Sequence, residues 1–440
     1  MLSGEDNRLL TQVGAGTAMG ELLRRFWLPA LLEEELAEPD GEPVRLRLLG
    51  EDLLAFRDSA GRIGIIDAYC AHRRAPLFFG RNEDCGLRCV YHGWKYDVQG
   101  NCIEMPSEPP EHDFKHKIKL TAYRSAVHGG VVWIYMGPPE LEPELPQFEW
   151  STLPRRQRTA TKRLQRCNWA QAVEGGIDSS HISFLHSRVD GVGLEASLGS
   201  GRTPYHASDR HPVFIVKETP YGLLIAARRS IEPDSYYWRL TQCLLPFYTM
   251  IPPVTSARDS SAVPYAGHAW VPVDDHTTWT WTFTANPHRD FSDAELAFHG
   301  GRDGMWGPVD EHYRPLRNRE NDYLIDRALQ KRVEFTGIVG IPNQDSAVQE
   351  GMGPIVDRGR ERLGTSDAAI IAWRRLILRL AEEVGQGRTP RAALVGESYN
   401  VRSASVILKR EVPYEEGAAY LLPGRSSRAA SAADLAGERG

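Results

Sequence analysis

Several features that would place the protein in other classes are missing from its sequence. The 440 residues carry 52 basic and 58 acidic side chains, a net charge of −6, so the basic excess typical of nucleic-acid-binding proteins is absent. No apolar run approaches the ~18 residues that a membrane helix needs, and residues 1–10 lack the charged-then-apolar layout of a signal peptide. We therefore expect a cytoplasmic protein that binds neither nucleic acid nor membranes.

Cysteine is also scarce, and its distribution is uneven. The chain has six cysteines, which in a chain of this length and without a signal peptide argues against a disulfide scaffold. Four of the six crowd into residues 70–102. This crowding predicts a metal site in that segment.

The hydrophobic pattern predicts mostly short strands in the first part of the chain. Residues 17–32 have the pattern of a short amphipathic helix, and residues 43–57 alternate apolar and charged side chains as a strand does. Residues 137–146 contain four prolines, which predicts a linker between two domains.

The second part of the chain mixes helices and strands. Threonines alternate with Trp279, Trp281 and Phe283, which is typical of a strand. Strands are expected within residues 213–283, and helices at residues 168–187, 308–332 and 366–384. Ser366 is the expected N-cap of the last helix and Gly385 its stop.

Two cysteine–histidine pairs form the strongest motif. One residue separates Cys70 from His72 and two separate Cys89 from His92, with sixteen residues between the pairs. Each pair can sit on one tight loop, and two such loops can hold a metal centre between them. One arrangement is a zinc ion bound by all four side chains. The other is a [2Fe–2S] cluster with both cysteines on one iron and both histidines on the other.

The order of the ligands favours the cluster. Zinc fingers usually pair Cys with Cys and His with His, whereas here each loop offers one of each, so both loops can reach both irons. Gly86 and Gly93 supply the tight turns that such loops need. The segments CAHRRAPLFFG and CVYHGWKYD resemble the Rieske domain family, which often has Pro where this chain has Ala71. Cys85 and Cys102 lie outside the pattern and are expected to be small buried or half-buried thiols.

A second group of polar residues lies further on. Glu174, Asp178, His181 and His186 fall within thirteen residues. On a helix, His186 lies about 140° from His181 at ~100° per residue, so both can bind one metal only if the helix ends or bulges between them. Two histidines and a carboxylate with open positions form the facial triad of non-haem Fe(II) oxygenases. The alternative is a helix with two half-exposed histidines.

The pattern E-x3-D-x2-H-x4-H, preceded by N-W-x-Q, resembles the catalytic domain of Rieske non-haem iron oxygenases. The resemblance implies that His181 and His186 bind iron and that Asn168 and Asp178 are catalytic. It gives Asp178 the role of a bridge to a cluster histidine, His92 by position, on a neighbouring subunit. A carboxylate can orient one ligand histidine of each site in this way.

The third iron ligand is expected to be a carboxylate further along the chain. Asp345 is the best candidate, in the stretch NQDSAVQEGMGPIVDRGRERLGTSD. This stretch and NRENDYLIDRALQ upstream resemble the phthalate dioxygenase-like branch, in which an aspartate at this position is the iron ligand. Asp357 and Glu350 remain alternatives.

The resemblance covers roughly residues 5–415 and implies an α+β fold. The expected parts are a helical segment on the catalytic domain (1–35), an all-β Rieske [2Fe–2S] domain (36–147), and a catalytic domain of helix-grip or START-like type with an antiparallel sheet flanked by helices (148–423). Residues 424–440 are rich in Ser, Ala, Arg and Gly, which predicts a disordered tail.

Cofactors and partners follow from the same resemblance. Enzymes of this branch hold one [2Fe–2S] cluster and one Fe(2+) per chain and use O2 to hydroxylate or dihydroxylate aromatic carboxylates of the phthalate or benzoate type. They form homotrimers or stacked pairs of trimers. NADH electrons reach them through a separate reductase with FMN and a [2Fe–2S] cluster. The chain itself has no convincing dinucleotide motif, since GAGTAMG at residues 14–20 lacks the preceding strand and the downstream acid.

Arginine is the natural partner of an aromatic carboxylate. Arg202, Arg210 and Arg239 lie in the region expected to form the pocket, and Ser179 lies beside the expected iron ligands. An exposed surface position is the alternative for each arginine.

Other functions fit parts of the pattern. A Rieske electron carrier leaves about 290 residues after residue 147 of the 440 unexplained. A zinc-stabilised binding protein would be colourless, whereas a Rieske protein absorbs visible light. Within the family, the alternative is a monooxygenase or O-demethylase that acts on an aromatic ether or heterocycle.

Overall fold

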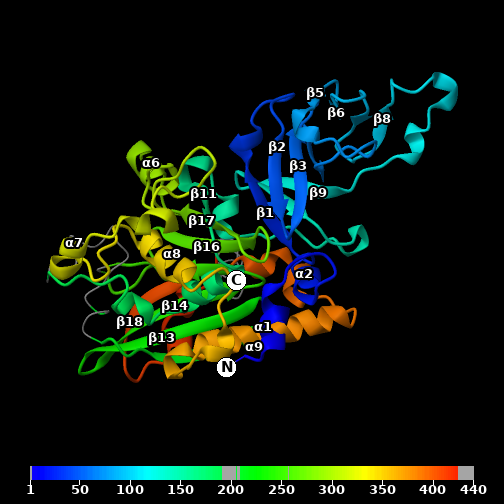
Figure 1. Ribbon diagram of the computed structural model, residues 1–440. Coiled ribbons are helices and arrows are strands. Elements are labelled where there is room, and N and C mark those ends of the chain that lie inside the picture. Colours follow the sequence, from blue (N-terminus) through cyan, green and yellow to red (C-terminus); the bar gives the residue numbers. More distant parts are fainter. Residues whose placement is uncertain (1, 191–204, 206–208, 256, 425–440) are drawn as a thin grey trace, which may run out of the picture. The chain divides into compact units, whose positions relative to one another are not determined.

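The structure is a computed structural model and describes residues 2–190, 205, 209–255 and 257–424. The chain forms two compact units, a smaller unit of Val13–Pro143 and a larger unit of Met1–Gln12 with Glu144–Gly440 (Figure 1). No helix in the described part combines the length and apolar character that a membrane span requires. Arg202 and nearly all of the predicted tail, residues 425–440, lie outside the described residues.

The smaller unit is built from two antiparallel sheets. The first has the strand order β1-β10-β9-β4-β3-β2 and the second the order β5-β6-β7-β8. Every residue of β10 is buried, as expected for a strand at the centre of a core. The strands are β1 (Trp27–Leu32), β2 (Val44–Leu48), β3 (Glu51–Arg57), β4 (Ile63–Asp67), β5 (Arg81–Glu83), β6 (Gly86–Arg88), β7 (Lys95–Tyr96), β8 (Cys102–Glu104), β9 (Ala122–His128) and β10 (Val131–Tyr135).

Two expectations for this unit are wrong. Residues 17–32 form helix α2 (Ala18–Leu23) followed by strand β1, because the apolar run from Trp27 pairs with β10 instead of continuing the helix. The segment 43–57 forms two strands, since Leu49 and Gly50 adopt left-handed backbone angles and reverse the chain between β2 and β3.

The pairing of β1 with β10 also moves the division between the units. A boundary at residue 35 would cut β1 away from its sheet, so the expected segment 1–35 is split after Gln12, and the second boundary falls at Pro143, inside the proline-rich segment. Only helix α1 (Gly4–Thr11) of the first 35 residues belongs with the larger unit, where it contacts helices α4 and α9.

The larger unit contains an eight-stranded antiparallel sheet in the described part of the chain. Its order is β11-β17-β16-β15-β14-β13-β12, with β18 also paired to β14. The strands are β11 (Arg158–Gln165), β12 (Val213–Thr219), β13 (Gly222–Glu232), β14 (Ser235–Leu244), β15 (Tyr248–Ile251), β16 (Tyr265–Pro272), β17 (Thr278–Ala285) and β18 (Ala404–Lys409). With the all-β smaller unit, this sheet and its helices confirm the α+β fold.

Helices pack against this sheet and against one another. Helix α4 contacts β15 and β16, and α9 contacts β12 and β13. Helix α9 buries residues at i, i+3, i+4 and i+7 spacing, such as Trp373, Leu376, Ile377 and Leu380, which is why it forms a long amphipathic helix. The helices are α3 (Glu149–Thr152), α4 (Trp169–Ile177), α6 (Asp293–Gly300), α7 (Arg327–Arg332), α8 (Ile341–Gly351), α9 (Ala368–Gly385), α10 (Arg391–Leu394) and α11 (Tyr414–Gly417).

Two helix predictions need correction. Of residues 308–332, only α7 and a short 3-10 segment at Arg319–Leu324, itself kinked at residues 321–323, are helical. Tyr313 and residues 322–324 take left-handed backbone angles that no α-helix accommodates. The expected long helix is confirmed as α9, but Asp367 stands at its N-cap position and Ser366 lies in the preceding turn.

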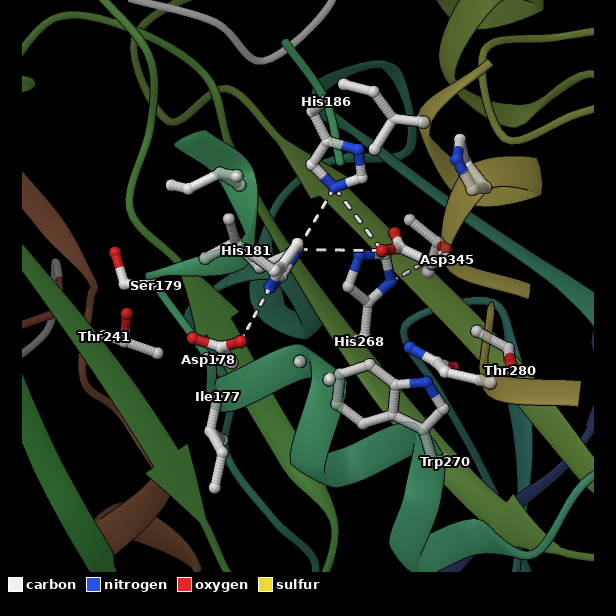
Figure 2. A pocket seen from close by; sticks show the side chains of 18 of the residues that line it. Ile177, Asp178, Ser179, His181, His186, Thr241, His268, Trp270, Thr280 and Asp345 are labelled. Atoms are coloured by element: carbon white, nitrogen blue, oxygen red, sulfur yellow. Dashed lines mark hydrogen bonds and ion pairs between the residues drawn. The ribbon is translucent and has the colours of Figure 1, made fainter. Parts of the chain in front are cut away.

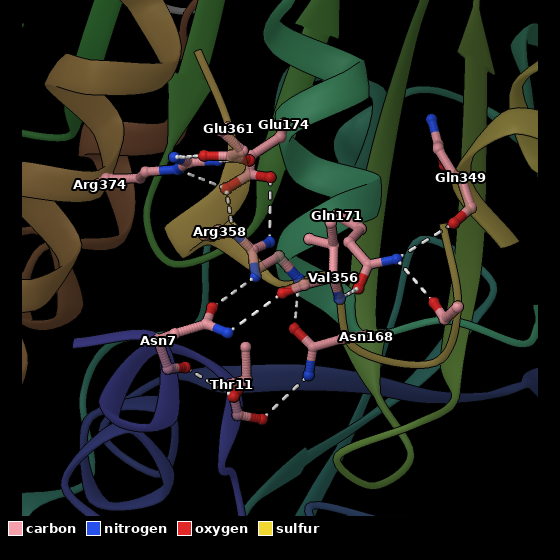
Figure 3. Close-up of polar contacts among 12 residues, drawn as sticks. Asn7, Thr11, Asn168, Gln171, Glu174, Gln349, Val356, Arg358, Glu361 and Arg374 are labelled. Carbon is pink, nitrogen blue, oxygen red and sulfur yellow. Dashed lines mark hydrogen bonds and ion pairs between the residues drawn. The ribbon is translucent and has the colours of Figure 1, made fainter. Parts of the chain in front are cut away.

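Buried ion pairs anchor helix α4, which leads into the site. Arg358 donates to both oxygens of Glu174, at 3.0 Å each, and Arg374 donates to Glu174 Oε1 at 2.7 Å (Figure 3). Asn7 of α1 accepts from Arg358 at 2.9 Å. Gly176 allows close packing, since a Cβ there would lie 1.9 Å from the Trp270 ring. The end of α4 is therefore fixed from several sides.

Candidate functional site

The two cysteine–histidine loops of the smaller unit share one backbone pattern. In the first loop the Arg74 N–H donates to Cys70 O, and in the second the Gly93 N–H donates to Cys89 O, both at 2.9 Å. Each cysteine N–H donates in turn to the carbonyl five residues later. Both Arg74 (φ 57°) and Gly93 (φ 77°) are in the left-handed region. The two loops thus have the same backbone conformation, and each presents one cysteine and one histidine.

The side chains of the two loops converge. Cys70 and Cys89 are 1% and 2% exposed, and the rings of His72 and His92 lie 4.4 Å apart between centroids. The Trp94 ring stacks on His72 at 4.6 Å. Two buried thiols, and two imidazoles whose rings meet edge to face, match the donor set of a Rieske cluster.

An unsatisfied atom supports this fit. His72 Nδ1 is buried and has no hydrogen-bond partner among the described residues. A buried ring nitrogen without a partner is costly unless something outside the protein occupies it. Iron bound at this nitrogen would satisfy it, so the residues present fit the cluster.

A second convergence lies in the larger unit (Figure 2). His181 Nε2 and His186 Nε2 are 3.1 Å apart, and Asp345 Oδ1 lies 3.6 Å from the first and 3.4 Å from the second. Among the described residues these three side chains form the group whose ligand atoms all lie within 4.8 Å of one another. The arrangement fits a metal bound by two histidines and one carboxylate.

The local backbone explains how the histidines meet. Helix α4 ends at Ile177 with Asp178 as its C-cap residue, and His181 begins a short 3-10 turn that ends at Ser183. The helix expected over residues 168–187 therefore stops before His181. This is the interruption that a shared metal requires.

The charges at the site are mutually supporting. Burial by itself raises the pKa of Asp345, but the neighbouring His186, His181 and Arg163 more than offset it and hold the pKa below its usual value. Asp178 Oδ2 lies 3.4 Å from His181 Nδ1, and its Oδ1 accepts from the Ser180 N–H at 2.6 Å. Asp178 thus orients His181 by the nitrogen that points away from Asp345.

A cavity of about 180 Å³ opens beside these three side chains. Its apolar wall includes Ile177, Ile251, Trp270 and Trp306, and His268 also faces it (Figure 2). An apolar protein cavity of about 150 Å³ holds benzene. The volume therefore suits one substituted aromatic ring.

Arg239 is one of the two arginines, with Arg163, that line this cavity. It lines the wall and is 5% exposed, yet its Nε and Nη1 are buried without a hydrogen-bond partner among the described residues. Ser179 lines the cavity as well. The fully buried Arg229 donates to Ser179 O at 2.6 Å. Burial, and in second place the charge of Arg239, lowers the pKa of Arg229 to about 10. Two buried cations side by side favour an anion.

Other predicted residues lie elsewhere. Asn168 is not among the residues that line the cavity; it caps α4 by accepting from the Ala170 N–H and donates to Thr11 O and Asp275 O, so its catalytic role stays a prediction. Arg210 is exposed, with its guanidinium 5.4 Å from the Phe184 ring, and the structure does not bring it into the cavity. The rival acid Glu350 accepts from the Tyr323 hydroxyl and from the backbone N–H of Arg166, and Asp357 is exposed.

Sequence reasoning missed several buried polar residues. Gln344 contacts His186, and Arg163 donates from β11 to Pro342 O and Ser346 Oγ of α8 at 2.8 and 3.0 Å. His268 faces the cavity from β16. The position of Gln344 next to Asp345 in the chain was the one available signal; Arg163, Arg229 and His268 look like ordinary strand residues.

Known proteins match both units. Residues 26–124 match the Rieske [2Fe-2S] domain and residues 134–416 the LigXa C-terminal domain like family. The chain is 43% identical over 389 residues to the phthalate 4,5-dioxygenase oxygenase subunit of Pseudomonas putida (86% of each chain). It is 38% identical over 430 residues to the 3-chlorobenzoate-3,4-dioxygenase oxygenase subunit of Comamonas testosteroni (93% and 96%). Among solved structures, NdmA of Pseudomonas putida CBB5 (QL mutant with theobromine) has a TM-score of 0.60 at 21% identity, over 90% of this chain and 99% of that one, and shows the fold alone.

The fold and the two convergent sites define the terminal oxygenase component of a Rieske non-haem iron system. The chain belongs to the ring-hydroxylating Rieske oxygenases with a LigXa-like C-terminal domain, together with phthalate 4,5-dioxygenase. It is therefore an oxygenase subunit that uses a [2Fe–2S] cluster and a mononuclear iron and depends on a separate reductase for electrons.

Proposed function

We propose that the chain oxidises an aromatic carboxylate of the phthalate or benzoate type in the cavity beside His181, His186 and Asp345. The observation that carries this proposal is that Nε and Nη1 of Arg239 are buried without a hydrogen-bond partner among the described residues, in a cavity of about 180 Å³ next to the three metal-ligand atoms. The named substrates of the two relatives are both aromatic carboxylates, which supports the same substrate class here.

His181 Nε2, His186 Nε2 and Asp345 Oδ1 are the proposed ligands of the iron. Ferrous iron held by two histidines and one carboxylate supplies open positions at which O2 is activated next to the substrate. The protein's part is to hold the three ligands, exclude water with the apolar wall and fix the ring. A carboxylate on Arg239 would fix the ring at one end, and Ser179 lies beside it in the same wall.

The charge of the substrate gives the first prediction. The acid should bind roughly 10–150-fold more tightly than its methyl ester, because the ester leaves Arg239 without a charge-assisted partner at a cost of about 1.5–3 kcal/mol. Substrate-dependent quenching or calorimetry on the intact oxygenase measures both constants.

The same ratio in variants tests the assignment of Arg239. In Arg239→Leu the preference for the acid should disappear, whereas Arg210→Leu, which changes an exposed arginine, should keep it. Equal binding of acid and ester by the wild-type protein would refute a carboxylate substrate. If Arg239→Leu still prefers the acid over the ester, another residue binds the substrate carboxylate.

Cys70, Cys89, His72 and His92 are the proposed ligands of the cluster. Tyr96 bears on its potential, because the Ala71 N–H donates to the Tyr96 oxygen at 3.2 Å, which directs the hydroxyl proton toward Cys70 Sγ, 3.1 Å away. A hydrogen bond to a ligand sulfur stabilises the reduced, more negative cluster.

Tyr96→Phe should therefore lower the reduction potential of the cluster. A loss of about 1 kcal/mol in the reduced state corresponds to roughly 40 mV for one electron. Protein-film or mediated titration measures the shift, and the ring of Phe preserves the packing of this fully buried position. Tyr123→Phe in the same unit, whose hydroxyl bonds to Glu51 instead, is the matched control and should leave the potential unchanged. An unchanged potential in Tyr96→Phe would contradict the predicted hydrogen bond.

We also propose that the active assembly is a homotrimer, or a stacked pair of trimers, in which His92 of the partner subunit meets Asp178. Two observations support this. Asp178 is 23% exposed although it orients His181, and Val90 and Tyr91 beside His92 are 58% and 55% exposed. An apolar groove lined by Phe184, Phe335 and Ile338 adjoins His181. Such a groove suits the exposed apolar side chains of Val90 and Tyr91 of the partner subunit.

The proposal also covers the electron-donating reductase and the place of the system in the cell. The reductase is expected to carry FMN and a [2Fe–2S] cluster and to draw on NADH, and the system is expected to be cytoplasmic. Sedimentation of the purified chain measures the assembly, and a mass of three or six chains is the expected result.

A further inference from the structure

His186 is held at both of its ring nitrogens. Its Nε2 faces Asp345 Oδ1 at 3.4 Å, and its Nδ1 lies 2.7 Å from Oε1 of Gln344. Gln344 is 1% exposed and immediately precedes Asp345 on helix α8. One turn of one helix therefore supplies a proposed iron ligand and the contact behind a second ligand.

The other end of the Gln344 amide fixes its orientation. Nε2 donates to the carbonyl oxygen of Ile338 at 2.9 Å. Because a carbonyl oxygen only accepts, the NH2 end of the amide must face Ile338 and the Oε1 end must face His186. Oε1 also only accepts, so His186 Nδ1 carries the proton. The lone pair of His186 is then on Nε2, which points at Asp345 and His181.

The two histidines differ in what stands behind them. His181 Nδ1 faces the carboxylate of Asp178 at 3.4 Å, whereas His186 Nδ1 faces a neutral amide. A carboxylate makes an imidazole more basic, and an amide sets its tautomer and ring plane without adding charge. One proposed ligand histidine is therefore backed by an anionic carboxylate and the other by a neutral amide.

Helix α8 is itself held rigidly. Arg163 donates to Pro342 O and Ser346 Oγ at 2.8 and 3.0 Å, on either side of Gln344 and Asp345. The first turn of α8 therefore has little freedom to let the Gln344 amide swing away from His186.

We propose that Gln344 is a positioning residue that locks His186 in the Nδ1–H tautomer and so sets the affinity of the site for ferrous iron. The proposal rests on the ligand set proposed above. It adds a residue that touches neither substrate nor metal and acts only through His186.

Iron affinity in three variants tests this role. The protein is depleted of mononuclear iron with its cluster intact, and ferrous iron is titrated back. Gln344→Leu should bind iron roughly 10–100-fold more weakly, the usual cost of losing such a partner. Gln344→Glu keeps an acceptor for Nδ1 but loses the donor to Ile338 O, so it should recover only part of the affinity.

Gln349→Leu is the matched control. Gln349 is a buried glutamine of the same helix, and its Oε1 accepts from Gln165 at 2.6 Å instead of from a histidine. A merely structural role predicts similar losses of melting temperature in Gln344→Leu and Gln349→Leu with no separate change in iron affinity. A positioning role predicts the affinity loss in Gln344→Leu alone.

A second readout reports the tautomer directly. In the protein loaded with cobalt(II), the Nδ1 proton of His186 should give a shifted, slowly exchanging NMR resonance that disappears in Gln344→Leu. Wild-type iron affinity in Gln344→Leu would overturn the role of Gln344. If instead His186→Ala binds iron as tightly as wild type, the ligand set itself fails, so the two failures are distinguishable.

Discussion

Replacing Asp345 with alanine should remove the mononuclear iron and reduce turnover below detection while the visible spectrum of the cluster survives. Asp345 is the sole anion among the three convergent ligand atoms, 3.4 and 3.6 Å from the histidine nitrogens. Without it, two neutral imidazoles must hold a divalent cation alone. Iron content should fall from about three to about two atoms per chain, since the cluster keeps its own pair.

The rival carboxylate provides the control. Asp357 is exposed and accepts from the Gly359 N–H at 3.0 Å, so Asp357→Ala should keep full iron and activity. Metal analysis and O2 uptake on both variants measure the result. An Asp345→Ala protein with full iron, or an iron-depleted Asp357→Ala protein, would show that the third ligand has been misassigned.

Asp178→Asn should have the second-largest effect, and on a different step. The amide keeps one acceptor for the Ser180 N–H but turns a donor toward His181 Nδ1, where the carboxylate now accepts. Both metal sites should stay filled and substrate should still bind. Transfer of electrons from the cluster to the mononuclear site should nevertheless collapse, because the proposed path runs through Asp178 to His92 of the partner subunit.

Single-turnover kinetics distinguishes a block of electron transfer in Asp178→Asn from a loss of iron. The pre-reduced oxygenase is mixed with substrate and O2, and reoxidation of the cluster is followed by its absorbance. Asp357→Asn, which changes an exposed acid of the same unit, should reoxidise at the wild-type rate. Reoxidation and product formation at the wild-type rate in Asp178→Asn would mean that Asp178 is a helix-terminal acid without a role in electron transfer.

The parts of the site that the sequence predicts are those with local causes. Each cluster loop needs only a cysteine, a histidine and one left-handed residue within five positions, so its spacing is visible in the chain. His181 and His186 are also close in sequence, and their angular mismatch on a regular helix already indicated the break that the structure has after Ile177.

The parts that the sequence does not predict depend on distant contacts. A polar residue at the start of a helix fits both a capping and a catalytic role, and the contacts of Asn168 with Thr11 and Asp275, which show the capping side, come from distant parts of the chain. Strand β14 is buried along nearly its whole length, so alternation does not reveal that Arg239 faces the cavity. Gln344 meets His186 across 158 positions of sequence.

A single turnover with isotopically labelled O2 tests the central claim most directly. The purified, pre-reduced oxygenase is given phthalate, 3-chlorobenzoate or benzoate, or the corresponding methyl ester. Mass spectrometry then measures the mass of the product and its content of labelled oxygen. The account predicts that at least one acid returns a hydroxylated product with labelled oxygen, in proportion to the cluster reoxidised, and that its ester returns far less. Oxidation of esters as readily as acids would contradict the assignment of Arg239 and of the substrate class. Cluster reoxidation without labelled product from any of the acids would contradict oxygenation of these aromatic carboxylates in this cavity.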